Sequence, residues 1–126
     1  MQGHKQKMRF AKGLPVINPA TGTDFVAIPH NSNISMGQMF PLLRYNGQPV
    51  DAEYARKRMQ WERLVEVTQI KGDSEAHPMF SPTDEFADYE TYPFVLTAEG
   101  GTPDPTKADY VRSGLKRGLE LHRPGH

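Results

Sequence analysis

A chain of 126 residues is long enough for one domain with a hydrophobic core and too short for two ordinary domains. Its fifteen basic and fifteen acidic residues give a formal net charge of zero, so we expect no overall field that would hold it on nucleic acid or on anionic lipid. Because it has no cysteine, it can form no disulfide and no thiolate zinc site, and any metal ion would need His, Asp or Glu.

The amino-terminal segment carries several basic residues but no apolar run of signal-peptide length, since Gly13, Pro15 and Asn18 interrupt it. No stretch approaches the roughly 20 apolar residues that a membrane span needs. The sequence therefore favours a cytoplasmic protein without a membrane partner.

The first elements in chain order are a leader and a strand. Residues 1–23 show no sustained hydrophobic period, which predicts an irregular leader. The run Phe25–Ile28 is apolar on both faces, as is typical of a central parallel strand, and Asp24 and Pro29 bound it. Residues 31–50 then mix turn formers with large apolar side chains, which predicts a long ordered loop that packs on the domain. Asn46-Gly47 predicts a turn within it.

A helix is predicted over residues 51–63. Asp51 can cap it, and the order of acidic first turn and basic last turn complements the helix dipole. It leads into a second apolar run, residues 64–70, which predicts another strand. Strand, helix and strand in this order predict a βαβ unit with a right-handed crossover and a parallel pair of strands.

The last third of the chain predicts a loop followed by a helix. Closely spaced prolines and glycines after Glu75 leave room for a short helical turn at most. A final helix is predicted from Thr106, its cap, to His122. Gly114 and Gly118 lower its intrinsic stability, which indicates close packing against a sheet or a neighbouring helix. One face of this helix carries Ala108, Val111, Leu115, Leu119 and His122.

His30 is the best candidate metal ligand, because it ends the first predicted strand and is followed by polar residues. An imidazole at the carboxyl end of a buried strand is how many α/β barrels place a metal ligand. It could bind Zn, Mn or Fe through one nitrogen while Asn31, Ser32 or Asn33 orients the other. The alternative is a histidine simply hydrogen-bonded at a strand end, and the spacing alone favours this alternative.

Carboxylates follow the second predicted strand at Asp73 and Glu75, so they could converge with His30 at one end of the sheet. There they could bind a metal ion or act as a general base toward metal-bound water. Asp73-Ser74 is equally an ordinary turn or cap dipeptide. Glu66, an acid inside an apolar strand, is either exposed at an edge or buried with a partner.

Three segments resemble, in order, the middle of the domain-of-unknown-function 3604 family: residues 26–33, 66–78 and 81–88. That family is similar to the PHP (polymerase and histidinol phosphatase) metallohydrolases, and the likeness runs from about Asp24 to Leu121. The resemblance implies an α/β fold, a partial, distorted (β/α) barrel with a few parallel strands, flanking helices and long loops. It also implies a metal centre at the carboxyl ends of the strands that hydrolyses phosphoester-like substrates with a metal-activated water.

The resemblance assigns a role to His30, which matches a PHP-type metal ligand, and we assign further roles to residues near it. Glu75 is assigned as a second ligand of a divalent Zn, Mn or Fe ion. Glu75 and Asp73 match motif positions near the site and are assigned as catalytic. Asn31, Asn33 and Lys71 are assigned to substrate binding.

The departures from the PHP pattern limit the expected activity. The chain has no H-x-H, and where the family would continue toward a D-x-H pair it reads His122-Arg123-Pro124-Gly125-His126. We therefore expect a hydrolase fragment that is weak or inactive alone, with its partial domain at residues 24–122 and a tail at 123–126. The alternative is a non-catalytic oligomerisation or binding module, its open strand edges covered by a second copy in a homo-oligomer or by the remainder of the domain.

Overall fold

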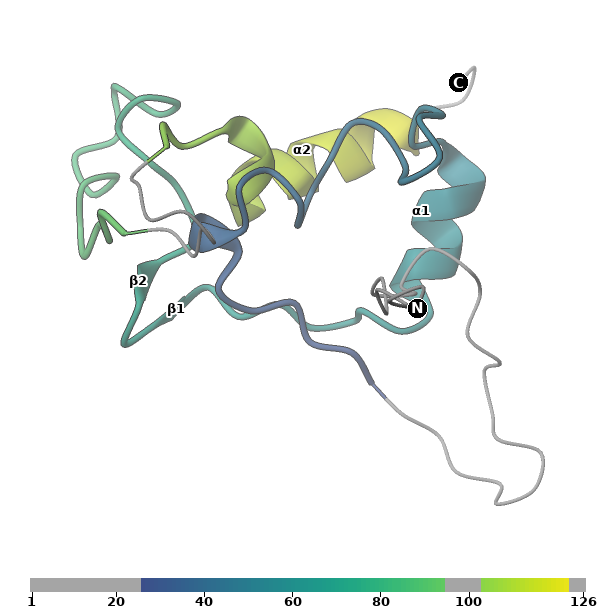
Figure 1. The fold of residues 1–126 in the computed structure, drawn as a ribbon, viewed down its shortest axis with the longest axis horizontal. Helices are drawn as coiled ribbons and strands as arrows, with labels where there is room; N and C mark the ends of the chain where they lie inside the picture. The colour runs from purple at the N-terminus through teal and green to yellow at the C-terminus, as the bar shows by residue number, and fades with distance from the viewer. Residues whose placement is uncertain (1–25, 95–102, 123–126) are drawn as a thin grey trace, which may run out of the picture.

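The computed structural model describes residues 26–94 and 103–122. Within them lie two α-helices, α1 (Ala52–Met59) and α2 (Val111–Leu121), and two short 3-10 helices, η1 (Ser32–Ile34) and η2 (Lys107–Asp109). The strands β1 (Thr68–Gln69) and β2 (Gly72–Asp73) form a hairpin at the opposite end of the molecule from α1 (Figure 1). No helix of the described residues is long and apolar enough to cross a bilayer.

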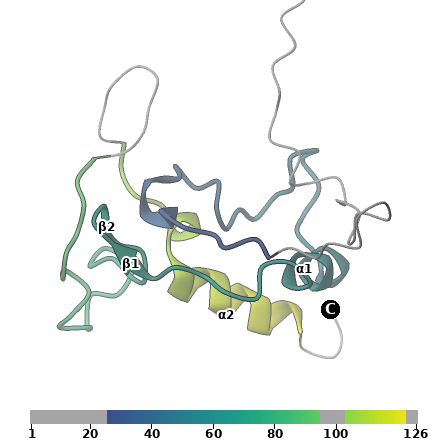
Figure 2. The same ribbon diagram turned by 90° about the horizontal axis from the view of Figure 1, so that it is seen from below.

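The predicted pair of parallel strands is wrong. Residues 26–28 and 64–67 form no strand, and the sheet of the described residues is the antiparallel hairpin, in which Thr68 pairs with Asp73 and Gln69 with Gly72. The two predicted strand segments do lie side by side (Figures 1 and 2). Two backbone hydrogen bonds of 2.9 Å hold residues 27–29 alongside residues 61–66, from Ala27 N to Trp61 O and from Glu66 N to Pro29 O.

The spacing of these two hydrogen bonds explains why no parallel ladder forms. The bonded residues are two positions apart in one segment and five apart in the other, so the segments cannot stay in register. A strand whose side chains are apolar on both sides also needs other parts of the protein to cover both faces of its sheet. Here Val26, Ile28 and Leu64 are 51%, 46% and 59% exposed, so the described residues supply no such layer and form no partial barrel.

The start of α1 is confirmed. Its N-cap is Asp51, whose carboxylate accepts a hydrogen bond of 2.8 Å from Tyr54 N, and Glu53 pairs with Lys57 one turn later at 2.8 Å. The helix ends at Met59 rather than at residue 63, because the chain turns away through hydrogen bonds to the Lys57 and Arg58 carbonyls. The turn predicted at Asn46-Gly47 is also confirmed, with Gly47 at φ +80°.

The predicted helix from Thr106 to His122 is interrupted. Thr106 caps η2, and Tyr110 is extended at φ −116° and ψ 136° before α2 begins. This break lets Tyr110 and Val111 both enter the core, whereas Leu115 and Leu119, on the predicted apolar face, are exposed. The close packing expected at the glycines exists at Gly114, where an added Cβ would lie 2.9 Å from the Phe40 ring, and not at Gly118.

The core is small and lies where η1, η2 and residues 74–76 meet. Its centre is polar, and the Asp109 carboxylate there accepts four hydrogen bonds: from Ser35 Oγ at 2.9 Å, Gly37 N at 2.5 Å, Thr106 N at 2.8 Å and Thr106 Oγ1 at 2.9 Å. The residues buried in this core are Ser32, Asn33, Ile34, Ser74, Ala76, Ala87, Asp109, Tyr110 and Val111.

Candidate functional site

A buried hydrogen-bond network joins the two loops that the sequence predicts to converge. Ser74 Oγ donates to Asn33 Oδ1 at 2.9 Å and accepts from Asn33 N at 3.3 Å. Asn33 Nδ2 donates to the Lys71 carbonyl at 2.8 Å. Buried polar side chains that satisfy one another in this way fix the relative position of their segments. The loop after His30 is therefore held against the segment that carries Asp73 and Glu75.

His30 lies three residues before Asn33 in the chain, and its side chain is exposed. Its Nδ1 lies 3.0 Å from the Ile28 carbonyl, and because a carbonyl can only accept, the Nδ1 nitrogen carries the proton. In the neutral imidazole this leaves a lone pair on Nε2, which is the arrangement of many metal-binding histidines. The hydrogen bond also fits the simpler alternative, a histidine bonded at the end of an extended segment.

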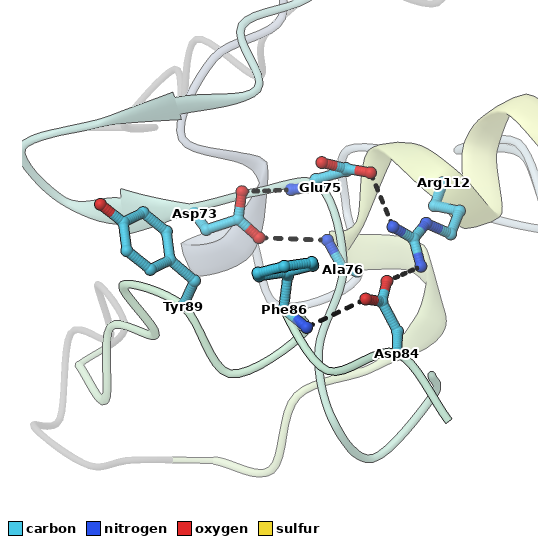
Figure 3. Close-up of a pocket in the computed structure, with 7 residues that line it drawn as sticks. All are labelled: Asp73, Glu75, Ala76, Asp84, Phe86, Tyr89 and Arg112. Atoms are coloured by element: carbon cyan, nitrogen blue, oxygen red, sulfur yellow. Dashed lines mark hydrogen bonds and ion pairs between the residues drawn. The ribbon is translucent and has the colours of Figure 1, made fainter. Parts of the chain in front are cut away.

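Asp73 and Glu75 line a pocket of about 240 Å³ (Figure 3). Its floor and walls come from the segment after β2, from the loop around residue 84 and from the first turn of α2. The lining residues are Asp73, Glu75, Ala76, Asp84, Phe86, Tyr89 and Arg112.

Asp73 closes a tight turn at the entrance to this pocket. Its Oδ1 accepts from Glu75 N at 3.0 Å and its Oδ2 accepts from Ala76 N at 3.2 Å. Both oxygens thus bind backbone N–H groups, which is the turn role that an Asp-Ser dipeptide commonly has. The turn directs the Glu75 side chain toward α2 (Figure 3).

Arg112 is the central side chain of the pocket, and sequence reasoning missed it. It donates to Glu75 Oε1 at 2.7 Å through Nη2 and to Asp84 Oδ2 at 2.5 Å through Nη1. The hydrogen bond to Glu75, followed by that to Asp84, raises the pKa of Arg112. The sequence carries one relevant signal: residues 73–90 hold six acids and no Lys or Arg, so a basic residue that pairs with them comes from elsewhere in the chain.

The charge of this pocket favours cations. Asp73, Glu75 and Asp84 face one guanidinium, which leaves a formal charge of −2 when all four groups are ionised. A negatively charged pocket repels a phosphate group that approaches without a counter-ion. The exposed rings of Phe86 and Tyr89 add faces that attract cations.

Arg112→Gln should raise the pKa of Asp84. The Arg112 hydrogen bond is the main cause that lowers this pKa below its ordinary value of 3.8. A carboxyl group with a lowered pKa stabilises the fold above its unfolded pKa, and the contribution is lost as the pH falls through the folded value. Titration of the Asp84 carboxyl carbon by NMR should show an upward shift in Arg112→Gln and none in Lys116→Gln, an exposed position one turn along α2. An unchanged Asp84 pKa would show that Arg112 does not hold this carboxylate in solution.

The other predicted site residues, Asn31, Asn33 and Lys71, do not line the pocket. Asn33 uses its amide in the buried network, and one oxygen of Asn31 is buried without a partner. Lys71 lies in the turn of the hairpin and does not line the pocket. Beyond these predicted residues, His77 accepts from Met79 N at 3.2 Å and packs against Phe80 and Tyr110. Burial raises the pKa of Tyr110 to about 12.

A divalent metal ion does not fit the described residues alone. His30 does not line the pocket, and both acids nearest to Arg112 are paired with it. In residues 26–94 and 103–122 no three His, Asp or Glu side chains lie close enough together to hold a metal ion. Catalytic zinc sites usually have three protein ligands, so we derive no catalytic step through a metal ion here.

In the part of the chain that the structure describes, two α-helices and a two-stranded sheet carry an acidic pocket. The chain belongs to the family described as Protein of unknown function (DUF3604), which matches residues 2–125. This match includes most of the leader, which the resemblance at about residues 24–121 did not reach. No curated protein and no solved structure matches the chain.

Proposed function

We propose that this chain forms part of a PHP-like, metal-dependent hydrolase that acts on phosphoester-type substrates. The observation that supports this function is the buried Asn33–Ser74 pair, which holds the His30 loop against the acidic segment. A hydrolase of this class needs a histidine nitrogen and carboxylates near one water molecule, and the pair brings the segments with these groups together. Membership of the DUF3604 family is consistent with the proposal, although the description of the family assigns no activity.

The proposed roles follow from which atoms remain free. His30 would bind the ion through Nε2, because Nδ1 is held by the Ile28 carbonyl. Glu75 would serve as ligand or base through the oxygen that Arg112 does not bind, and Asp73 would position Glu75 through the turn. The remaining ligands must come from outside the described residues, so the described part alone would be weak or inactive. When bound, the metal ion would supply an activated water.

His30→Ala should abolish the metal binding of this chain. We expect weak binding of Zn²⁺ or Mn²⁺ by isothermal titration calorimetry, weaker than that of a site with three protein ligands, and loss of the signal in His30→Ala. His122→Ala, which removes an exposed histidine at the end of α2, is the matched control and should bind like the parent chain. Any metal-stimulated hydrolysis of a generic phosphomonoester should follow the same pattern. Metal binding that survives in His30→Ala would contradict the proposal.

A non-catalytic self-association module is the second candidate function. It is favoured by the exposed apolar side chains on the two segments that the sequence predicts to be buried strands. The two candidates are compatible, because self-association uses side chains other than those that would bind the metal ion.

A further inference from the structure

We infer that the buried side-chain oxygens of Asn31, Ser32 and Glu66 form a binding site for an alkali-metal cation, sodium or potassium. This inference goes beyond the proposed hydrolase function and does not depend on it. Together these three residues are the buried oxygen cluster.

The atoms of the cluster are buried and have no hydrogen-bond partner within the described part of the chain. They are Oδ1 of Asn31, Oγ of Ser32 and Oε1 of Glu66. Ser32 is fully buried, at 0% exposure, and its hydroxyl donates to neither of the other two oxygens. An amide oxygen and an ionised carboxylate oxygen only accept, so they cannot satisfy each other. A buried carboxylate oxygen without a donor or counter-charge is costly, and a ligand that supplies positive charge offsets this cost.

The cluster comes from two stretches of chain that are joined to each other at two points. Glu66 N donates to the Pro29 carbonyl at 2.9 Å. Ser74 N donates to the carbonyl of Val67 at 2.6 Å, and Ser74 Oγ accepts from Asn33 N at 3.3 Å. The stretch between Pro29 and Asn33, which carries the other two oxygens, is therefore held at each end to Glu66 or to its neighbour.

The buried oxygens of both stretches point to the interior of the molecule. Ile28 and Val67, which lie next to the two stretches, are exposed, so solvent lies on the other side. Backbones that are joined by hydrogen bonds lie roughly 5 Å apart, a gap that a glutamate side chain can span. The carboxylate oxygen of Glu66 therefore faces the loop that carries the amide and hydroxyl oxygens.

The chemistry of the cluster selects the ligand. Carboxylate, amide and hydroxyl oxygens are the donors that hard cations prefer, and such oxygens can replace the hydration shell of an alkali cation. The cluster carries one formal negative charge. A monovalent cation balances this charge, whereas a divalent cation would leave excess positive charge buried. A water molecule would supply hydrogen-bond donors but no counter-charge for the carboxylate.

Exchange of salts at constant ionic strength tests the site. The midpoint of urea unfolding of the 126-residue chain should be higher in sodium or potassium chloride than in tetramethylammonium chloride, whose cation is too large for the cluster. At a cation concentration ten times the dissociation constant, the ratio of folded to unfolded chain should rise about elevenfold. Separate titrations with the two alkali chlorides distinguish sodium from potassium.

Two substitutions should change this response in opposite directions. Glu66→Gln removes the negative charge and supplies an amide donor, so the chain should gain stability in tetramethylammonium chloride and lose its response to alkali cations. Asn31→Asp adds a second carboxylate at a residue whose φ of 55° Asp also tolerates. It should destabilise the chain in tetramethylammonium chloride and tighten cation binding about tenfold. Glu120→Gln, at an exposed acid on α2, is the control and should respond like the parent chain.

The outcomes separate this site from a buried water molecule and from the proposed hydrolase site. An unfolding midpoint that is the same in all three salts overturns the inference, because water then suffices for the three oxygens. An alkali response that survives in Glu66→Gln, or that Asn31→Asp does not strengthen, also overturns it. The response should persist in a chelator of divalent ions and in His30→Ala, so failure of the proposed metal site is distinguishable from failure of this one.

Discussion

Asp109→Ala should destabilise the fold by about 3–5 kcal/mol, which is a large fraction of the stability of a small domain. Asp109 is almost fully buried and accepts four hydrogen bonds from residues 35–37 and from Thr106. Removing the carboxylate leaves two backbone N–H groups and two hydroxyls without their acceptor. We expect the midpoint of urea unfolding, followed by the fluorescence of Trp61, to fall sharply.

Asp109→Asn should be nearly as damaging as Asp109→Ala. Each carboxylate oxygen accepts from one backbone N–H, Oδ1 from Gly37 and Oδ2 from Thr106. An amide offers a single acceptor oxygen, so its NH₂ group must face one of these N–H donors whichever way it is turned. Asp88→Ala, at an exposed acid, is the control and should change stability by less than about 0.5 kcal/mol. An Asn variant as stable as the parent chain would show that the carboxylate charge and its second acceptor are not needed.

Local signals in the sequence predicted the parts of the fold that short-range chemistry determines. Asp51 caps α1 as expected, because a cap needs only the side chain and the backbone three residues later. The Asn46-Gly47 turn depends on a positive φ that glycine adopts readily. The end of α1 was missed, because turn hydrogen bonds to the Lys57 and Arg58 carbonyls set it. The start of α2 was missed, because it is set by which residues enter the core. Tyr110 leaves helical geometry in order to become buried.

The parallel strands were mispredicted for a different reason. An apolar run shows that a segment needs cover on both faces, and it does not say which part of a protein provides that cover. In the described residues Val26 and Leu64 have no such cover and the segments do not form a ladder. Burial predicted from hydrophobicity was therefore wrong for Val26, Ile28 and Leu64 within the described residues.

The candidate site was predictable as segments and only partly as residues. The sequence brings the His30 loop and the Asp73–Glu75 segment together through a parallel strand pair that does not form, and the Asn33–Ser74 pair holds the two together instead. Arg112 was missed because its partners, Glu75 and Asp84, are 37 and 28 residues away in sequence. No periodicity or motif carries such a contact, whereas an imbalance of charge between segments shows only that a pairing cation would come from outside the acidic segment.

Gly72→Ala should destabilise the hairpin next to the pocket by about 3 kcal/mol or more, through strain and steric overlap together. Gly72 lies at φ +90°, and an added Cβ would lie 2.6 Å from both the Glu90 carbonyl oxygen and the Tyr92 Cβ. The backbone cannot move away cheaply, since Asp73 N donates to the same Glu90 carbonyl at 3.0 Å. Asp73 would be displaced with it, and the turn that directs Glu75 toward Arg112 would be lost.

Gly47→Ala separates the two contributions to this effect. Gly47 lies at φ +80° but has no atom within 4 Å of an added Cβ, so its substitution adds backbone strain alone. We expect a loss of about 1 kcal/mol at Gly47 and at least twice that at Gly72 in urea unfolding of the two variants. In Gly72→Ala the NMR titration of Asp84 should also change, because Glu75 no longer shares Arg112 in the same geometry. Equal losses at the two glycines would mean that strain alone determines the cost and that residues 90–92 do not pack against the hairpin in solution.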